Sequence, residues 1–168
     1  MSILHKHSIW GTAWAVAIAT LVSATPASPG YAGGPAIRLA VVVAKNSPLD
    51  NLSIHDLKHL FMGQNITGPN GQKLIPLAPT QNSPERTAFD SAILGMSPEQ
   101  EQSYWIDRKI RGQPGAPKAI DSVDVMRKVV GRLEGAVGYV KATDVGPDVK
   151  VVRIDGKAPG DPGYRVEQ

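Results

Sequence analysis

The chain contains no cysteine among its 168 residues. This absence excludes disulfide bonds, cysteine nucleophiles, thiolate metal sites and a lipid-modified cysteine as a membrane anchor. Aromatic residues make up only 5% of the chain, and the formal net charge is only +3. Lysines and arginines form no runs interleaved with aromatics, so nucleic-acid binding is not predicted. The length and the overall composition of the chain are those of one globular domain.

The N-terminal part of the chain has the pattern of a secretory signal peptide. Lys6 precedes an apolar run over residues 9–22, which is shorter than the ~20 residues that a membrane-spanning helix needs. Small residues and prolines follow this run, with candidate cleavage points after Ala24 and Ala32. We therefore predict that residues 1–32 are a cleaved signal, that the protein is periplasmic or secreted, and that it has no membrane span. The alternative is a buried N-terminal helix.

Residues 33–155 alternate between strand and helix patterns. The apolar, β-branched run at 37–44 is typical of a strand that is buried on both faces. Further strands are predicted at 73–78, 136–140 and 149–154. Helices are predicted to begin at capping residues, namely Ser53, Ser83, Ser97 and either Asp121 or Ser122. The pattern predicts one α/β domain with a mixed β-sheet flanked by helices. Residues 156–168, rich in glycine, proline and charge, are predicted to form a flexible C-terminal tail.

Four motifs follow one another in a distinctive order: LKHLFMG at 57–63, NSPERTAF at 82–89, Tyr104-Trp105, and GAVGYV at 135–140. In this order and spacing they resemble the second lobe of the phosphate-binding proteins that serve ABC transporters. They resemble even more closely the short, single-lobe relatives of that group, within the type II periplasmic binding protein fold. The resemblance covers roughly residues 37–154.

The resemblance implies an exported, non-catalytic solute-binding domain for phosphate or a similar small oxyanion. An ABC transporter permease or another envelope protein is then the expected protein partner. Two alternatives stay open. The chain could be a protein-interaction or accessory module that keeps the fold without a small-molecule ligand. It could also be a homodimer in which a second copy supplies the missing lobe.

The resemblance also implies an anion site at residues 82–86. In the family, a Gly-Ser-Gly-Thr turn at a helix N-terminus, often followed by arginine, holds the phosphate. Here Asn82, Ser83 and Arg86 occupy the matching positions, and they are expected to supply a hydroxyl and a cation. Pro84 has no N–H to donate, and Glu85 places a negative charge beside the site. The alternative is therefore that Ser83 only caps a helix and that Arg86 is solvated.

Three more residues are expected beside Ser83. Thr80 follows the second predicted strand, and Asn46 and Ser47 follow the first. Ligands of α/β folds bind at the carboxyl ends of strands. Topology therefore predicts that these side chains line the same site.

Motifs for other chemistry are not supported by their context. His55 and His59 lie one helical turn apart, as in a zinc motif. Both are predicted to point away from the buried face of their helix, and no third ligand is evident, so no metal site is predicted. Without a nucleophile elbow or a dinucleotide fingerprint, the sequence predicts neither an enzyme nor a bound cofactor.

Overall fold

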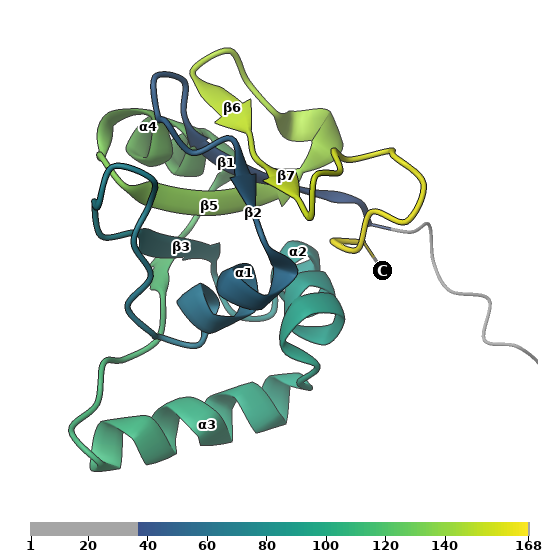
Figure 1. The fold of residues 1–168 in the computed structure, drawn as a ribbon. Coiled ribbons are helices and arrows are strands. Elements are labelled where there is room, and N and C mark those ends of the chain that lie inside the picture. The colour runs from purple at the N-terminus through teal and green to yellow at the C-terminus, as the bar shows by residue number, and fades with distance from the viewer. Residues whose placement is uncertain (1–36, 168) are drawn as a thin grey trace, which may run out of the picture. The chain divides into compact units, whose positions relative to one another are not determined.

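The computed structural model describes residues 37–167, so the predicted signal at 1–32 lies outside the described residues (Figure 1). The strands of the described part are β1 (Leu39–Ala44), β2 (Asn51–Leu52), β3 (Ile75–Pro79), β4 (Lys118–Ile120), β5 (Ala136–Lys141), β6 (Val149–Val151) and β7 (Arg153–Ile154). Its α-helices are α1 (Ile54–Phe61), α2 (Pro84–Phe89), α3 (Pro98–Ile110) and α4 (Val123–Arg132). A π-helical turn, η1 (Asp90–Leu94), continues α2, and a short 3₁₀ turn, η2 (Ala142–Asp144), follows β5.

Within residues 37–167, five strands form a mixed sheet in the order β4-β3-β5-β1-β6. β3 pairs in parallel with β4 and with β5, whereas β1 pairs antiparallel with β5 and with β6. The carboxyl ends of β4, β3 and β5 therefore lie at one edge of the sheet. The carboxyl end of β1 lies at the opposite edge.

Helices cover both faces of this sheet, as the apolar run of β1 predicts. Leu39, Val41 and Val43 pack on one face, in a core that includes residues of α1, α2 and η1. Ala40 and Val42 pack on the other face against α4. Every residue of β1 is buried. The predicted α/β architecture is therefore confirmed, and Figure 1 shows α1 and α2 on the opposite side of the sheet from α4.

Serine caps start the helices where the sequence predicts them. The hydroxyls of Ser53, Ser83, Ser97 and Ser122 each accept a hydrogen bond from the backbone N–H three residues later. Gly138 explains why α4 lies so close to β5. A Cβ at this position would lie 2.7 Å from the Sδ of Met126 and 3.0 Å from the Cγ2 of Val130, so a larger residue would push these α4 side chains away from β5.

The structure differs from the predicted elements in several places. The helix that begins after Ser83 changes to a π-helical turn at Asp90, before Gly95 ends it with a φ of 69°. The strand predicted at 149–154 is divided between β6, which joins the large sheet, and β7, which pairs with β2. β2 has only two residues, too few for a periodic pattern to reveal it.

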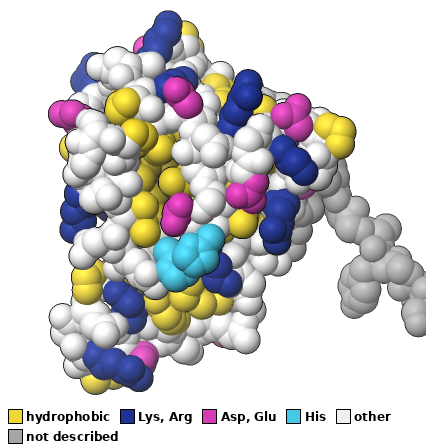
Figure 2. Space-filling model, viewed as in Figure 1, with side chains coloured by type: hydrophobic (Ala, Val, Ile, Leu, Met, Phe, Trp, Pro, Cys, Tyr) yellow, Lys and Arg dark blue, Asp and Glu magenta, His cyan; other side chains and the backbone are white. Residues whose placement is uncertain are grey.

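The surface of α1 carries the histidines of the zinc-like motif. The rings of His55 and His59 stack with centroids 4.0 Å apart, and they form the cyan patch in Figure 2. Within residues 37–167, no group of three or more metal-ligating side chains comes together. No helix in the same range is both long and apolar enough to cross a bilayer.

The segment expected to be a flexible tail is packed on the domain. Tyr164 and Val166 are buried in the same core as β1. The hydroxyl of Tyr164 donates to the carbonyl of Leu39 at 2.9 Å, and the N–H of Leu39 donates to the carbonyl of Val166 at 2.9 Å. Composition alone misled the prediction, because two well-spaced apolar residues are enough to anchor a segment rich in glycine and proline.

Replacing Tyr164 by alanine tests this packing. Removal of a buried aromatic side chain should lower the free energy of unfolding by about 3–5 kcal/mol, as measured by urea denaturation. Arg165→Ala is the matched control, because Arg165 is exposed on the same segment and should change stability by less than about 0.5 kcal/mol. Equal, negligible effects of both changes would contradict the packed arrangement.

Candidate functional site

A small cavity lies at the edge where β4, β3 and β5 end. Its volume is about 120 Å³, and its polar lining includes Thr80, Ser83, Glu85, Asp121 and Ser122. Thr80 follows β3, and Asp121 and Ser122 follow β4. The parallel pairing of these strands brings loops together that lie about 40 residues apart in the sequence. We call this space the carboxyl-edge cavity.

Hydroxyl groups of the carboxyl-edge cavity are held by the helices that begin beside it. The Oγ of Ser83 accepts from the N–H of Arg86 at 3.2 Å, and the Oγ of Ser122 accepts from the N–H of Val125 at 3.3 Å. A serine hydroxyl that accepts a hydrogen bond can still donate its own proton. Ser83 and Ser122 can therefore both cap a helix and donate to a ligand in the cavity.

The structure brings only some of the predicted site residues together. Thr80 and Ser83 line the carboxyl-edge cavity. Asn82 lies in the turn between them with a φ of 67°, and it lines a neighbouring cavity between α2 and α3. Asn46 and Ser47 line a different cavity, together with Gln72, which lies in the loop before β3. The expectation that they lie beside Ser83 is wrong, because β1 runs antiparallel to β5 and its carboxyl end reaches the opposite edge.

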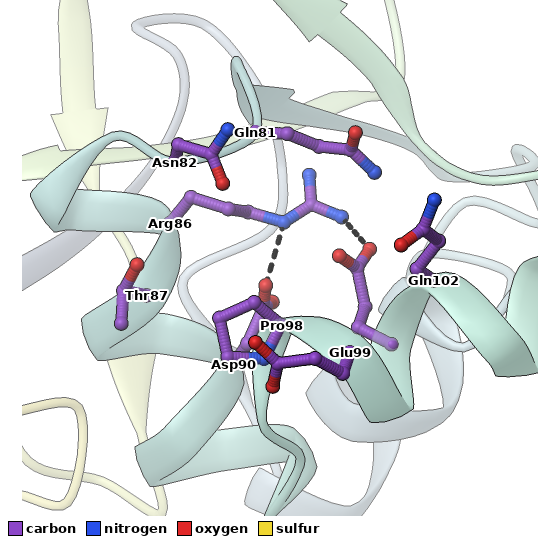
Figure 3. Close-up of a pocket in the computed structure, with 9 residues that line it drawn as sticks. Gln81, Asn82, Arg86, Thr87, Asp90, Pro98, Glu99 and Gln102 are labelled. Carbon is purple, nitrogen blue, oxygen red and sulfur yellow. Dashed lines mark hydrogen bonds and ion pairs between the residues drawn. The ribbon is translucent and has the colours of Figure 1, made fainter.

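Arg86 is not solvated, and it does not line the carboxyl-edge cavity. Its side chain is buried, and its Nε donates to the Oδ2 of Asp90 at 2.8 Å. Its Nη2 donates to the Oε1 of Glu101, and the same oxygen accepts from the indole Nε1 of Trp105 at 2.7 Å. Figure 3 shows the guanidinium directed at these carboxylates. The guanidinium therefore serves as an internal link between α2, η1 and α3, and the expectation that Arg86 is solvated is wrong.

Burial and the neighbouring charges have opposing effects on the pKa values of Arg86 and Asp90. Burial raises the pKa of Asp90 from 3.8 to about 6, although the Arg86 guanidinium opposes that rise. Burial lowers the pKa of Arg86, but the Tyr139 hydroxyl and the two carboxylates outweigh it, so the net shift is upward. Burial also raises the pKa of Tyr139, whose hydroxyl has no hydrogen-bond partner within residues 37–167.

An ion pair borders the carboxyl-edge cavity. The Nζ of Lys141, the last residue of β5, lies 2.9 Å from the Oε1 of Glu85. Burial raises the pKa of Glu85, but the hydrogen bond and charge of Lys141, with a backbone hydrogen bond, outweigh it and hold that pKa below its usual value. The same hydrogen bond raises the pKa of Lys141. Both side chains are therefore charged at neutral pH.

Sequence reasoning missed Asp90, Glu101 and Lys141. The spacing of four residues between Arg86 and Asp90 is a recognisable helical ion pair and could have been found. Glu101 lies 15 residues from Arg86 and on another helix, so no local pattern connects them. Lys141 and Glu85 meet only because β5 ends beside the beginning of α2.

Several solved structures resemble the described domain, among them the following three. An ABC-type phosphate transport receptor from Vibrio cholerae has a TM-score of 0.63 and 21% identity, over 79% of this chain and 54% of the other. PstS from Borrelia burgdorferi has a TM-score of 0.61 and 10% identity, over 79% and 55%. A Clostridium perfringens structure with bound phosphate has a TM-score of 0.63 and 20% identity, over 79% and 53%. The chain shares their fold.

The match confirms the predicted single lobe of the type II periplasmic binding protein fold. The chain spans about half the length of the solved structures that it matches. No family model matches the sequence. The likeness therefore concerns the arrangement of strands and helices. The identity of a ligand must be inferred from the residues that line the cavity.

The pKa of Asp90 gives the domain an unusual pH dependence. The folded protein retains a proton on Asp90 up to about pH 6, whereas the unfolded chain releases it near 3.8. This group therefore adds stability as the pH falls through 6, and the gain is complete below about pH 4. We expect wild-type protein to gain about 1–3 kcal/mol relative to Asp90→Asn between pH 7.5 and 4.5, measured by urea denaturation at each pH.

A surface pair provides the control for this measurement. Asp107 also faces an arginine four residues away, Arg111, with the charged atoms 2.9 Å apart, but both side chains are more than half exposed. Asp107→Asn should therefore differ from wild-type protein by nearly the same amount at both pH values. A pH-independent effect of Asp90→Asn would show that Asp90 is ionised throughout this range.

Proposed function

We propose that the chain is an exported, non-catalytic solute-binding domain that holds phosphate or a similar oxyanion in the carboxyl-edge cavity. The observation that carries this proposal is the convergence of hydroxyl donors, from Thr80, Ser83 and Ser122, at the carboxyl ends of three parallel strands. A protein of the same fold contains bound phosphate. Asn82 lies in the turn before Ser83, and we include its side-chain amide as an additional contact to the oxyanion.

The chemistry of the cavity favours an oxyanion that still carries a proton. The carboxylate of Asp121 lines the cavity, and a carboxylate can only accept hydrogen bonds. Phosphate at neutral pH has at least one P–OH group that can donate to such an acceptor. Sulfate has none, so its oxygens would face the Asp121 carboxylate without a proton between them. The proposal therefore includes a preference for phosphate over sulfate.

Export and delivery are part of the same proposal. The predicted signal at 1–32 would carry the domain out of the cytoplasm. An ABC transporter permease is the corresponding partner, since the proteins that share the fold include an ABC-type phosphate transport receptor. An envelope protein other than a permease would serve equally well as an acceptor of the loaded domain.

Calorimetric titration of the purified protein with phosphate at fixed ionic strength tests the function. We expect a sub-millimolar dissociation constant for phosphate and weaker binding of sulfate. Ser83→Ala and Ser122→Ala each remove a hydroxyl donor to a charged ligand, and each should weaken phosphate binding by about ten- to a hundredfold.

Ser97→Ala is the matched control. Ser97, like Ser83, caps a helix that continues with proline, and its Oγ accepts from the N–H of Gln100 at 3.3 Å. Its removal should lower stability by about 1 kcal/mol without changing the affinity for phosphate. Absence of phosphate binding by the wild-type protein, or equal losses in Ser97→Ala and Ser83→Ala, would refute the assignment of this cavity.

A second candidate function is that of a protein-interaction module, and α3 is the observation that favours it. Ile106 and Ile110 lie one turn apart on this helix and are 52% and 79% exposed. Figure 2 also shows hydrophobic side chains gathered between α1 and α3. In this case Ile106→Ser with Ile110→Ser should reduce self-association or partner binding, measured by sedimentation velocity over a range of concentrations, and phosphate should have no effect.

A further inference from the structure

The cation of the proposed site has to be identified anew, because Arg86 is engaged inside the protein. Its Nε and Nη2 donate to Asp90 and Glu101, and its Nη1 lies 3.5 Å from the carbonyl of Pro79. Arg86 is not among the residues that line the carboxyl-edge cavity, and its Nε and Nη2 hold two buried carboxylates that would lose their partner if the side chain moved to meet an anion there. That would cost far more than a single hydrogen bond to the anion returns.

Lys141 is placed where such a cation is needed. It directly follows Tyr139 and Val140, which line the carboxyl-edge cavity. Its side chain is 42% exposed, so the ammonium group can change position without breaking the core. An ammonium group has three donors, and a flexible lysine stem lets them turn toward a new acceptor.

Glu85 occupies the position that an anion would take beside Lys141. Its side chain lines the cavity together with Ser83, and only 15% of it is exposed. Its carboxylate lies 2.9 Å from the Lys141 ammonium. Negative charge is thus already present at the place where the hydroxyl donors and the lysine meet.

We propose that Lys141 is the cation that contacts the oxyanion, and that Glu85 is an internal competitor which the oxyanion displaces from Lys141. This inference rests on the proposed function of the carboxyl-edge cavity. Oxyanion binding then carries a free-energy cost, because the displaced Glu85 carboxylate must turn toward solvent. Glu85 is then also the residue that sets the affinity, while Ser83 and Thr80 set the position of the ligand.

Other carboxylates near Lys141 limit how strongly it attracts an anion. Asp144, in η2, contributes to the raised pKa of Lys141, and Asp121 lines the cavity. Neither contacts the Lys141 ammonium as an ion pair in the described residues. Removing the charge of Glu85 should therefore release Lys141, whereas the repulsion from Asp121 remains.

The test is a phosphate titration of Lys141→Gln and Glu85→Gln in the full chain. Lys141→Gln should weaken phosphate binding by about ten- to a hundredfold, because a charged hydrogen bond to the ligand is lost. Glu85→Gln should strengthen it by about tenfold, because the competing charge is gone while the side chain keeps its shape.

Lys150 and Asp50 offer matched controls, since they form another lysine–carboxylate ion pair, whose lysine lies on the edge strand β6, two strands away from β5. Lys150→Gln and Asp50→Asn change the net charge of the protein by the same amounts as the test variants. They should leave the affinity for phosphate unchanged. Melting temperatures of all four variants show whether each one is folded.

The outcomes separate this inference from the proposed function. The inference would be overturned if wild-type protein binds phosphate but Lys141→Gln and Glu85→Gln have the same affinity for phosphate as wild-type protein or their control variants. The proposed function would then stand. Weaker binding by Glu85→Gln would overturn the competitor role. Phosphate binding that is absent in wild-type protein but present in Glu85→Gln would overturn the proposed function, while it would support the competitor role of Glu85. Absence of binding in both would overturn the inference and the function together.

Discussion

The buried charge of Arg86 constrains everything around the carboxyl edge of the sheet. One guanidinium bonds Asp90 in the π-helical turn and Glu101 in α3, and it lies close to the end of β3. A buried cluster of paired charged side chains is costly to form. Removing one of its members costs still more, because a buried charge is then left without a partner. The geometry of this cluster therefore fixes how α2, η1 and α3 meet, and it withdraws from the site the residue that a sequence motif would assign to the ligand.

That constraint changes what the likeness to phosphate-binding proteins implies. The strands and helices are those of a single lobe of such a protein, and the chain spans about half of the solved structures that it matches. The charged residues at the cavity follow from this chain's own sequence and not from the shared fold. Hydroxyls from Ser83 and Ser122 lie at the cavity, but carboxylates line it as well, and the nearby lysine is paired with one of them. Affinity should therefore depend on the balance between Lys141 and Glu85 rather than on the fold.

The sequence predicts the fold well because the signals for it are local. The apolar run of β1 and the serine caps of the helices stand in continuous segments, and each lies where it is expected. The site is predicted only in part. Thr80 and Ser83 share one loop, so they stay together, whereas the position of Asn46 depends on the direction of β1, which no local pattern encodes. The partner of Arg86 on α3 is likewise a product of tertiary packing.

The most direct test of the account is an amide NMR titration of the protein with phosphate. If the carboxyl-edge cavity binds the anion, chemical-shift changes should concentrate at residues 80–86, 121–125 and 139–142, with saturation at millimolar phosphate or below. Residues 46–47, at the opposite edge of the sheet, should not respond. Changes confined to that opposite edge, or no saturable change anywhere in the domain, would contradict the proposal that this lobe binds phosphate at the carboxyl ends of β3, β4 and β5.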